Sequence, residues 1–541
     1  MPAPLPFSTA RFARFGWSLL APLVFLAPLV AAQPLAAAPR SFDQVLSADV
    51  AETPAIANFY RMHGYADLWT GDDDADRRAA LFAALDQAGT QGLPVARYDA
   101  AVLRAAFRAL VTQGDRGRLE ATMTRAYLAF ARDLSSGALE PGEIDATIVR
   151  APVRPDPAFL LSMTQVADFA GFLAKLPPNH PEYAALIREK IRLENRLATG
   201  GFGPIIAAES LAPGDVGAAV VALRDRLQAF GYLGASATRD YDGQVTAAVQ
   251  RFQLDSGLSM TGIAGASTIA ALNAEPSQRL QAVVVALERL RWMGDAPWGK
   301  RYIWVNQPDF TAQVVDDGKV TFQTRVVIGK TTSDTRSPEF SDLMEFMVIN
   351  PSWSVPRSIT TKEYLPMLRA NPNAVGHLQL IDRSGRVVSR DAVNFAAYSA
   401  ANFPYALRQA PSDGNALGKV KFMFPNAQNI YLHDTPTKSL FANEVRAYSH
   451  GCIRVGAPFD LAYVLLAPQS DDPKALFQSY LDGGRESRLA FDTPIPVHLV
   501  YFTAWPNAKG MMTYRQDIYG RDTKIFDALR SAELAALDVQ G

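Results

Sequence analysis

The sequence contains one cysteine, six histidines and no marked excess of either charge. Among its 541 residues, 53 Lys and Arg stand against 54 Asp and Glu, so the formal net charge is −1. A single cysteine excludes an internal disulfide framework and any zinc or iron–sulfur site built on several cysteines. The balanced charge excludes the basic footprint of a dedicated nucleic-acid binder. The hydrophobic share of 48% excludes wholesale disorder and is ample for folded cores.

Beyond the first forty residues, the sequence lacks an uninterrupted apolar run of about 20 residues, the length that spans a membrane. Before that point, Arg11 and Arg14 precede an apolar stretch, residues 17–30, which ends in small residues. This pattern is typical of a signal peptide, so we expect residues 1–32 to form one, with cleavage between about 32 and 38. The alternative is an uncleaved membrane anchor.

The segment that follows, residues 41–205, predicts a helical region. Apolar side chains recur at helical spacing in residues 79–85, 119–134 and 183–197. We find no catalytic constellation there and interpret the region as a helical scaffold. A Gly- and Pro-containing stretch, residues 200–217, then predicts a linker.

A compact unit, residues 210–274, predicts three short helices separated by glycine turns. Its apolar and glycine positions follow a fixed order: Leu211-x-x-Gly214-x-x-Gly217-x-x-Val220-x-x-Leu223, then Val249-x-x-Phe252-Gln253, then Gly262 and Thr268. This order resembles the peptidoglycan-binding domain found beside many wall enzymes. The alternative is a packing module that binds no glycan, because fold does not imply function.

The last part of the chain changes from helical to strand periodicity. Residues 277–298 predict a buried connector helix, and residues 300–505 predict a β-rich domain. Its expected strands are 302–305, 311–315, 322–328, 345–349, 429–433 and 496–502, with Asp317-Gly318 as a hairpin turn. Residues 357–418 break this pattern into helix and loop, which predicts a flap over a site. Residues 506–541 form a C-terminal segment, helical from 515 to 537. The expected fold class is therefore multidomain α+β.

The candidate chemistry gathers around the only cysteine. Cys452 stands in Tyr448-Ser449-His450-Gly451-Cys452-Ile453-Arg454, a polar, turn-like setting that favours a reactive thiol. A thiol nucleophile needs a base, and His433 ends a predicted strand nineteen positions upstream. Backbone N–H groups of Gly451 and Cys452 are candidates for an oxyanion hole. We expect Arg454 and a protonated histidine to lower the thiol pKa.

Zinc is the competing chemistry for this region. Its ligands would be His433, His450 and Cys452, but the sequence contains no His-Glu-x-x-His motif or tighter ligand pair. We therefore favour a cysteine nucleophile and expect no cofactor.

The passage from His433 to Ser449-His450-Gly451-Cys452 resembles the signature of the peptidoglycan L,D-transpeptidases. Further segments resemble the large Gram-negative murein form of that family: Val305-Asn306 with Phe310, Arg325-Val326-Val327-Ile328-Gly329-Lys330, Asn350-Pro351-Ser352-Trp353-Ser354-Val355-Pro356 and Lys421-Phe422-Met423-Phe424-Pro425-Asn426. The order of helical scaffold, peptidoglycan-binding domain and interrupted catalytic domain is similar too. One departure is Arg454, which stands where smaller members often have Asn.

The resemblance implies a role for each matching residue. Cys452 is the expected nucleophile and His433 the expected base, with the backbone carbonyl of Asp434 as the group that orients it. Ser449 and His450 are expected either to shape the site directly or to fix the turn that carries the thiol. Trp353 and Tyr431 are expected to contact substrate in the cleft, with core packing as the alternative.

The resemblance also implies an activity and a location. The donor is a tetrapeptide stem: the thiolate attacks the diaminopimelate carbonyl, D-Ala leaves, and a diaminopimelate amine of a neighbouring stem forms a 3–3 cross-link. Hydrolysis by water (an L,D-carboxypeptidase), transfer to a protein lysine, and a non-enzymatic wall-binding scaffold are the alternatives. The expected location is the periplasm, or the inner membrane facing it. A glycan polymerase and a D,D-carboxypeptidase are expected partners, and carbapenems are expected to acylate the same thiol.

Overall fold

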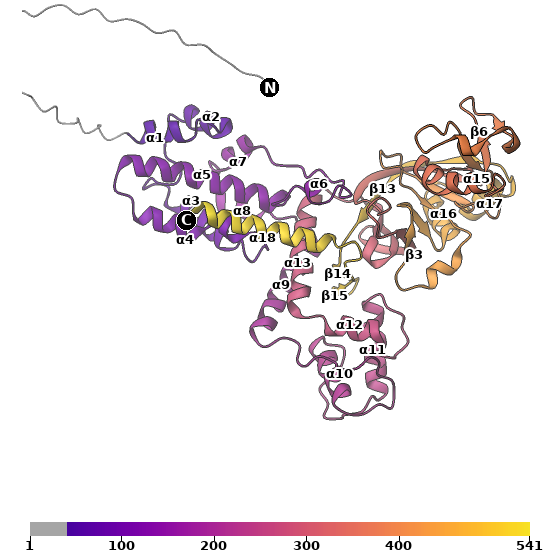
Figure 1. Ribbon diagram of the computed structural model, residues 1–541. Coiled ribbons are helices and arrows are strands. Elements are labelled where there is room, and N and C mark those ends of the chain that lie inside the picture. Colours follow the sequence, from indigo (N-terminus) through magenta and orange to yellow (C-terminus); the bar gives the residue numbers. More distant parts are fainter. Residues whose placement is uncertain (1–40, 541) are drawn as a thin grey trace, which may run out of the picture.

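The computed structural model describes residues 41–540, so the expected signal peptide lies outside the described residues. Figure 1 shows three lobes: a helical one, a small helical one, and a β-rich one. Two helices, α13 (Pro276–Met293) and α18 (Arg521–Gln540), lie where the lobes meet. The expected α+β class is confirmed. Within residues 41–540, no helix combines the length and the apolar character needed to cross a membrane.

The first lobe is built from helices whose starts are set by capping side chains. Ser41 forms a capping box with Gln44, while Asp99 and Asp156 accept backbone N–H groups of the helices they precede. The elements are α1 (Phe42–Asp49), α2 (Pro54–Met62), α3 (Ala75–Asp86), η1 (Val95–Tyr98), α4 (Ala100–Arg108), α5 (Gln113–Ser136), α6 (Pro141–Ile144), α7 (Pro157–Met163), α8 (Phe169–Ala174) and α9 (Pro181–Ala198). Glu120, fully buried, accepts the backbone N–H groups of Leu68, Trp69 and Thr70, which fixes the turn before α3.

The second lobe confirms the three expected short helices. They are α10 (Ala218–Ala229), α11 (Gly243–Asp255) and α12 (Ala266–Asn273), and they enclose their own apolar core, which includes Val220, Leu223 and Phe252. Gly262, at φ +74°, forms the turn before α12. The connector α13 then begins with a capping box at Glu275 and is almost wholly buried, as expected.

The third lobe is a closed sheet. Its strands are β1 (Arg301–Asn306), β2 (Thr311–Asp316), β3 (Lys319–Gly329), β4 (Phe340–Ile349), β9 (Val420–Met423), β10 (Leu432–His433), β11 (Ala447–Ser449), β12 (Ile453–Val455) and β13 (Ser487–Val500). They run in the order β11-β3-β12-β10-β9-β4-β13-β1-β2, and β3 also pairs with β2, so the sheet closes on itself. Helices α16 (Pro458–Leu466) and α17 (Pro473–Asp482) follow β12 and pack on the core of this sheet.

Most expected strands are confirmed, but the one expected at 429–433 is shorter. Asn429 has a left-handed backbone (φ +55°), and the Asn426 side chain bonds to both backbone groups of Ile430. This loop conformation delays the strand until Leu432. The expected hairpin turn at Asp317-Gly318 is present, with both residues at positive φ.

The expected flap is more regular than the sequence indicated. It contains a separate sheet of order β5-β8-β6-β7 with its own apolar core. Its elements are α14 (Arg357–Ile359), η3 (Thr360–Tyr364), α15 (Leu365–Ala370), β6 (Gln379–Ile381), β7 (Val387–Val388), η4 (Arg390–Ala392), η5 (Phe395–Ala397) and β8 (Ala406–Gln409), and β5 (Trp353–Ser354), just before the flap, completes the sheet. The strands are too short for alternation to predict them.

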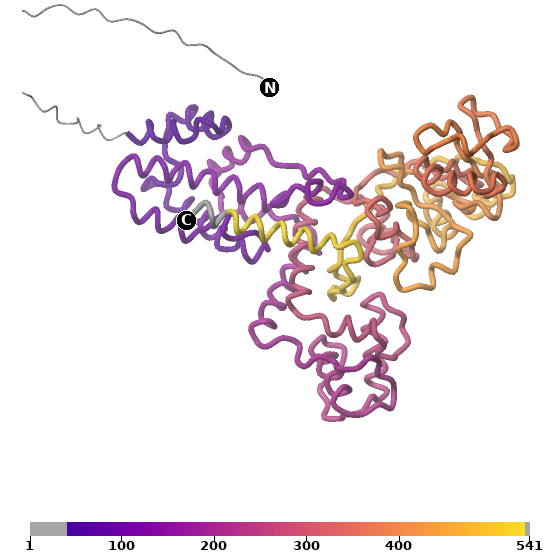
Figure 2. The backbone as a smooth tube through the Cα atoms, in the orientation of Figure 1, coloured from indigo at the N-terminus to yellow at the C-terminus, as the bar shows by residue number. Residues whose placement is uncertain are grey.

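The C-terminal segment returns to the first lobe. The hairpin of β14 (Ala504–Pro506) and β15 (Met512–Tyr514) precedes α18, which contacts η1, α6 and α13. Figure 2 shows this end of the chain lying beside the N-terminal helices. At its start, Arg521 and Arg289 of α13 both pair with the buried Glu339. The segment therefore fastens the sheet to the helical lobe.

Candidate active site

Cys452 lies in the short turn between β11 and β12. The Ser449 hydroxyl donates to the Cys452 carbonyl at 2.6 Å, and Ser337 donates to the Gly451 carbonyl at 2.6 Å. Gly451 has φ +118°, and a Cβ there would lie 3.2 Å from Ile430 Cδ1. The turn is therefore fixed by glycine and two hydroxyl groups, and Ser449 acts on it as a positioning residue.

His433 is carried on the strand next to the thiol. Strand β10 pairs in parallel with β12, with His433 opposite Arg454. The imidazole is buried, and its Nδ1 lies 2.5 Å from the backbone carbonyl oxygen of Asp434. This contact requires Nδ1 to carry the proton, which leaves Nε2 unprotonated as an acceptor.

The Asp434 side chain holds that carbonyl in place. Its carboxylate accepts the backbone N–H of Lys419 at 2.9 Å and that of Thr435 at 2.6 Å, and it pairs with Lys438. Gly418 has a positive φ, and a Cβ there would overlap the carboxylate. Asp434 is therefore a structural anchor that acts through its own carbonyl on His433.

Cys452 and His433 line one cavity of about 870 Å³. Of the residues predicted for the site, Trp353, Tyr431, Ser449, His450 and Arg454 line the same cavity. Gly451 and Asp434 stand behind its wall. The opposite wall comes from the 357–418 insertion and the strand β5 before it, so the insertion covers the thiol side of the sheet.

His450 turns toward the insertion. Its Nε2 lies 2.6 Å from a carboxylate oxygen of Glu363 in η3, and the neighbouring Lys362 pairs with Asp334 at 2.9 Å. His450 therefore ties the cysteine turn to the insertion. No three side chains of the metal-binding type converge anywhere within residues 41–540.

Burial dominates the electrostatics of the thiol. It raises the pKa of Cys452 to about 11, although hydrogen bonds from Tyr431 and the charge of Arg454 act in the opposite direction. Our expectation of a lowered thiol pKa is therefore wrong, because the cost of burying a thiolate exceeds what the nearby cations return. Burial, followed by the charge of Cys452 and the hydrogen bond to it, also raises the pKa of Tyr431.

Burial also keeps His433 neutral. It lowers the pKa of the imidazole to about 3, and the charge of Arg454 acts in the same direction. Near pH 7 the two groups are therefore a thiol and a neutral imidazole, and the chemistry open to them is proton transfer during attack. The Gly451 N–H donates to Ser449 Oγ at 3.1 Å, so this expected oxyanion donor already has an acceptor.

Sequence reasoning missed three groups near the thiol. Lys421 on β9 stands opposite His433 in the sheet register, and its charge acts to lower the thiol pKa. The Asn429 carbonyl oxygen lies 3.6 Å from Cys452 Sγ, and Glu363 binds His450. Of the three, only Lys421 could have been found from the sequence, because it begins the segment Lys421-Phe422-Met423-Phe424-Pro425-Asn426 that resembles the family. The other two depend on loop conformation.

Comparisons with known proteins match three regions of the chain. Residues 300–485 match the model of the L,D-transpeptidase catalytic domain, residues 54–189 match that of a scaffold domain, and residues 216–272 match that of a "Putative peptidoglycan binding domain". A "Putative L,D-transpeptidase" of Haemophilus influenzae is 33% identical over 247 residues, which are 45% of this chain and 49% of that protein. The chain thus spans about half the length of this curated relative.

Solved structures of L,D-transpeptidases are similar at lower identity. That of Xylanimonas cellulosilytica (residues 123–326) is 16% identical with a TM-score of 0.17, and covers 55% of this chain and 100% of its own. That of Stackebrandtia nassauensis is 16% identical with a TM-score of 0.23, and covers 55% and 97%. The domain match and the curated relative both indicate that residues 300–485 form an L,D-transpeptidase catalytic domain.

Proposed function

We propose that this chain is a peptidoglycan L,D-transpeptidase in which Cys452 is the nucleophile and His433 the general base. The observation that carries the proposal is the shared cavity: a thiol and an imidazole on adjoining segments both line it, within the matched catalytic domain. The Asp434 carbonyl supports it by orienting Nε2 as an acceptor.

In the first step the thiol attacks the diaminopimelate carbonyl of a tetrapeptide stem. As the S–C bond forms, His433 Nε2 accepts the thiol proton, and the carbonyl oxygen becomes an oxyanion. The C–N bond to D-Ala then breaks, and the same proton passes from His433 to the leaving amine. A thioester on Cys452 and free D-Ala result. Because both groups begin neutral, no ion pair has to form in advance.

In the second step an amine of a diaminopimelate on a neighbouring stem attacks the thioester. His433 takes a proton from the amine and returns it to the departing Cys452 sulfur, which regenerates the thiol and leaves a 3–3 cross-link. We propose Trp353 and Tyr431 as substrate contacts, since both line the cavity. Replacing Trp353 with Ala tests this: an unchanged KM in a folded protein would remove it from the site.

Carbapenems should acylate the same thiol, because opening of the lactam is the same attack on a carbonyl. The lactam C–N bond breaks within the ring, so the adduct keeps the full mass of the drug. We therefore expect intact-mass spectra to show one drug per chain on the wild type and none on Cys452→Ala. A drug adduct on Cys452→Ala would contradict the assignment.

We further propose that the chain works in the periplasm, on the evidence of the pattern in residues 1–32. Cell fractionation with N-terminal sequencing tests this proposal. A mature N-terminus between about 32 and 38 is expected, and an intact N-terminus in the membrane fraction would indicate an anchor instead.

The direct test of function uses purified disaccharide-tetrapeptide with wild type, Cys452→Ser and Cys452→Ala, followed by mass spectrometry. We expect a cross-linked dimer lacking one D-Ala from the wild type alone. Tripeptide without dimer would assign a hydrolase, and identical products from all three proteins would contradict a cysteine mechanism. Because a serine hydroxyl and a cysteine thiol differ little in size, we expect Cys452→Ser to fold as the wild type does. A circular dichroism melt of each variant checks this, so that a loss of product can be assigned to the chemistry.

A further inference from the structure

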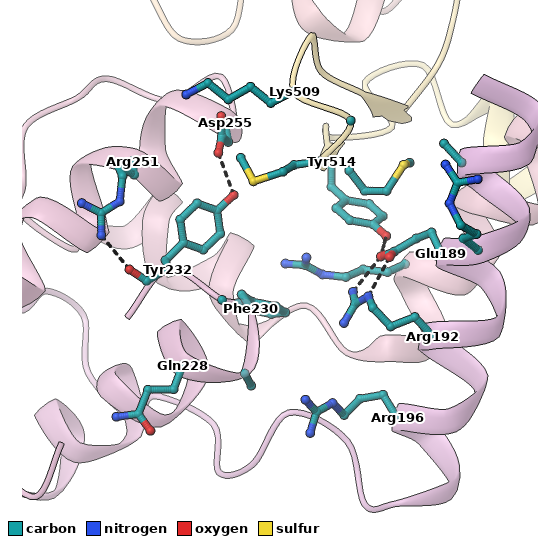
Figure 3. A pocket seen from close by; sticks show the side chains of 18 of the residues that line it. Glu189, Arg192, Arg196, Gln228, Phe230, Tyr232, Arg251, Asp255, Lys509 and Tyr514 are labelled. Atoms are coloured by element: carbon teal, nitrogen blue, oxygen red, sulfur yellow. Dashed lines mark hydrogen bonds and ion pairs between the residues drawn. The ribbon is translucent and has the colours of Figure 1, made fainter. Parts of the chain in front are cut away.

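A second cavity lies where the three lobes meet, away from Cys452. It measures about 870 Å³, a size within the usual range of ligand sites, and shares no lining residue with the catalytic cavity. Its walls are α9 of the helical lobe, the ends of α10 and α11, and the β14–β15 hairpin. Figure 3 shows Arg192 and Arg196 extending from α9 toward the wall that carries Tyr232 and Arg251, with Lys509 of the hairpin near its edge.

The lining of this interdomain cavity is strongly cationic in a chain that is nearly neutral overall. Six cations line it, namely Arg188, Arg192, Arg196, Arg251, Arg279 and Lys509, against the carboxylates of Glu189 and Asp255. Glu189 is already engaged, since it accepts two hydrogen bonds from Arg192 at 2.7 Å and one from Tyr514. Asp255 accepts the Tyr232 hydroxyl at 3.0 Å. Glu189 is therefore paired with Arg192, and the single charge of Asp255 is outnumbered by the five other cations of the lining.

Four of the cations have no carboxylate partner in the part of the chain that the structure describes: Arg188, Arg196, Arg251 and Lys509. Arg279 adds a stronger sign of an unfilled site. Only 8% exposed, it stacks over the Phe230 and Tyr514 rings at 4.0 and 4.5 Å, and its Nε has no hydrogen-bond partner within residues 41–540. A buried guanidinium donor left unpaired is costly unless a ligand supplies the acceptor.

The arrangement of charges limits the kind of ligand. The cations stand on three different walls, so one compact anion cannot contact them all, whereas a short chain carrying several carboxylates can. The lining also contains the apolar side chains Phe230, Leu254 and Met512, which suit small apolar groups of a ligand. Arginine binds carboxylates through paired N–H groups, and Arg192 and Arg196 of α9 project into the cavity (Figure 3).

We infer that this interdomain cavity is a second, non-catalytic binding site for the anionic stem peptides of peptidoglycan. The inference rests on the proposed function for the identity of the ligand, because tetrapeptide stems carry several carboxylates on a short chain with alanine side chains. A stem peptide bound here would place its glycan strand at the junction of the lobes. The protein would then bind the wall through its helical lobe, α10–α12 and the hairpin together.

The test is calorimetric titration of the full chain with soluble disaccharide-tetrapeptide. The background is Cys452→Ala, which prevents turnover and leaves the interdomain cavity intact. Arg196→Glu with Lys509→Glu reverses one charge on each of two walls. The matched control is Lys175→Glu with Arg530→Glu, which makes the same changes at exposed, unpaired positions outside the cavity. Thermal melts establish that all three proteins are folded.

We expect the cavity variant to lose one binding site relative to its background, with affinity there weakened about tenfold or more, while the control keeps it. A ligand whose carboxylates are amidated should fail to occupy the same site in the background protein. Equal stoichiometry in variant and background, or full occupancy by the amidated ligand, would overturn the inference.

This result is separable from the proposed function. Arg196→Glu with Lys509→Glu in a chain with Cys452 intact should convert soluble tetrapeptide at the wild-type kcat. A charge-dependent site in a chain that forms no Cys452-dependent product would leave the inference standing and refute the transpeptidase. Cys452-dependent turnover in a chain that shows no charge-dependent binding at the interdomain cavity would support the transpeptidase and refute the inference.

Discussion

Two cavities of equal size, about 870 Å³ each, hold opposite kinds of electrostatic site. In the catalytic cavity, burial decides the protonation of the thiol and the imidazole, and both are neutral near pH 7. In the interdomain cavity, Arg188, Arg196, Arg251 and Lys509 have no carboxylate partner among the described residues. The difference teaches that a chemical site can work through proton transfer between neutral groups, whereas a binding site for a charged ligand works through charge that the fold leaves uncompensated.

The largest effect that would sharpen this comparison is loss of the base. In His433→Gln, no group accepts the thiol proton, so we expect the rate of acylation by a carbapenem to fall about a thousandfold. Binding in the interdomain cavity should not change. Intact-mass time courses measure the first, and titration measures the second.

His377→Gln is the matched control, because His377 lines the same cavity but is exposed. If both histidine variants slowed acylation alike, His433 would have no special role as the base, and the catalytic side of the comparison would fail.

The next effect concerns the resting thiol. Because the folded pKa of Cys452 is raised to about 11, the thiol stays protonated at pH 7, and its thiolate fraction is about a hundredfold below that of an ordinary cysteine. Alkylation by iodoacetamide should be slower by that factor and rise about tenfold per pH unit up to pH 11. Since iodoacetamide is uncharged, salt should leave the rate unchanged.

The same chain in urea serves as the reference for an ordinary thiol. Alkylation of the folded chain at the rate of the unfolded one at pH 7 would mean that burial does not raise the thiol pKa, and a faster rate would indicate a thiolate–imidazolium pair. Burial would then no longer govern the catalytic cavity, and the contrast with the interdomain cavity would disappear.

A smaller effect tests the anchor of the base. Gly418 and Gly385 both have positive φ, so alanine strains the backbone at either position by about 1 kcal/mol. At Gly418 the new Cβ also overlaps the Asp434 carboxylate, whereas at Gly385 no atom lies within 4 Å. We expect Gly418→Ala to slow acylation about tenfold and Gly385→Ala to leave it unchanged. Equal rates would mean that Asp434 does not position His433.

The predictability of each part followed from where its information lies in the chain. Helices with long periodic faces, such as α5 and α9, and the residues of the thiol turn were predictable, because each signal is contained in a short stretch. The strands of the insertion were not, since β5 and β7 are two residues long and their pairing is non-local. The pKa of Cys452 was mispredicted because burial is a property of the packed cavity and not of the neighbouring residues.

The interdomain cavity could not be predicted at all. Its cations come from segments more than 300 residues apart, α9 and the β14–β15 hairpin, which approach only because α13 and α18 join the lobes. Taken alone, Arg188, Arg192, Arg251 and Lys509 are each ordinary exposed residues on a helix or a turn. Only their convergence, together with the unpaired Nε of Arg279, marks them as a site.

The smallest expected effect concerns the contact between His450 and Glu363 in the catalytic cavity, whose side chains are partly exposed. The His450–Glu363 hydrogen bond joins side chains that are 31% and 45% exposed, so its coupling in a double-mutant cycle should be below about 1 kcal/mol. His450→Gln should therefore slow acylation less than about threefold, because Lys362–Asp334 ties the same part of the insertion to the domain. Lys362→Gln is the matched control, because it removes the Lys362–Asp334 ion pair and keeps the His450–Glu363 hydrogen bond. A loss above tenfold in His450→Gln alone would make His450 part of the chemistry, and a partly exposed hydrogen bond would then help to govern a cavity that burial is expected to govern alone.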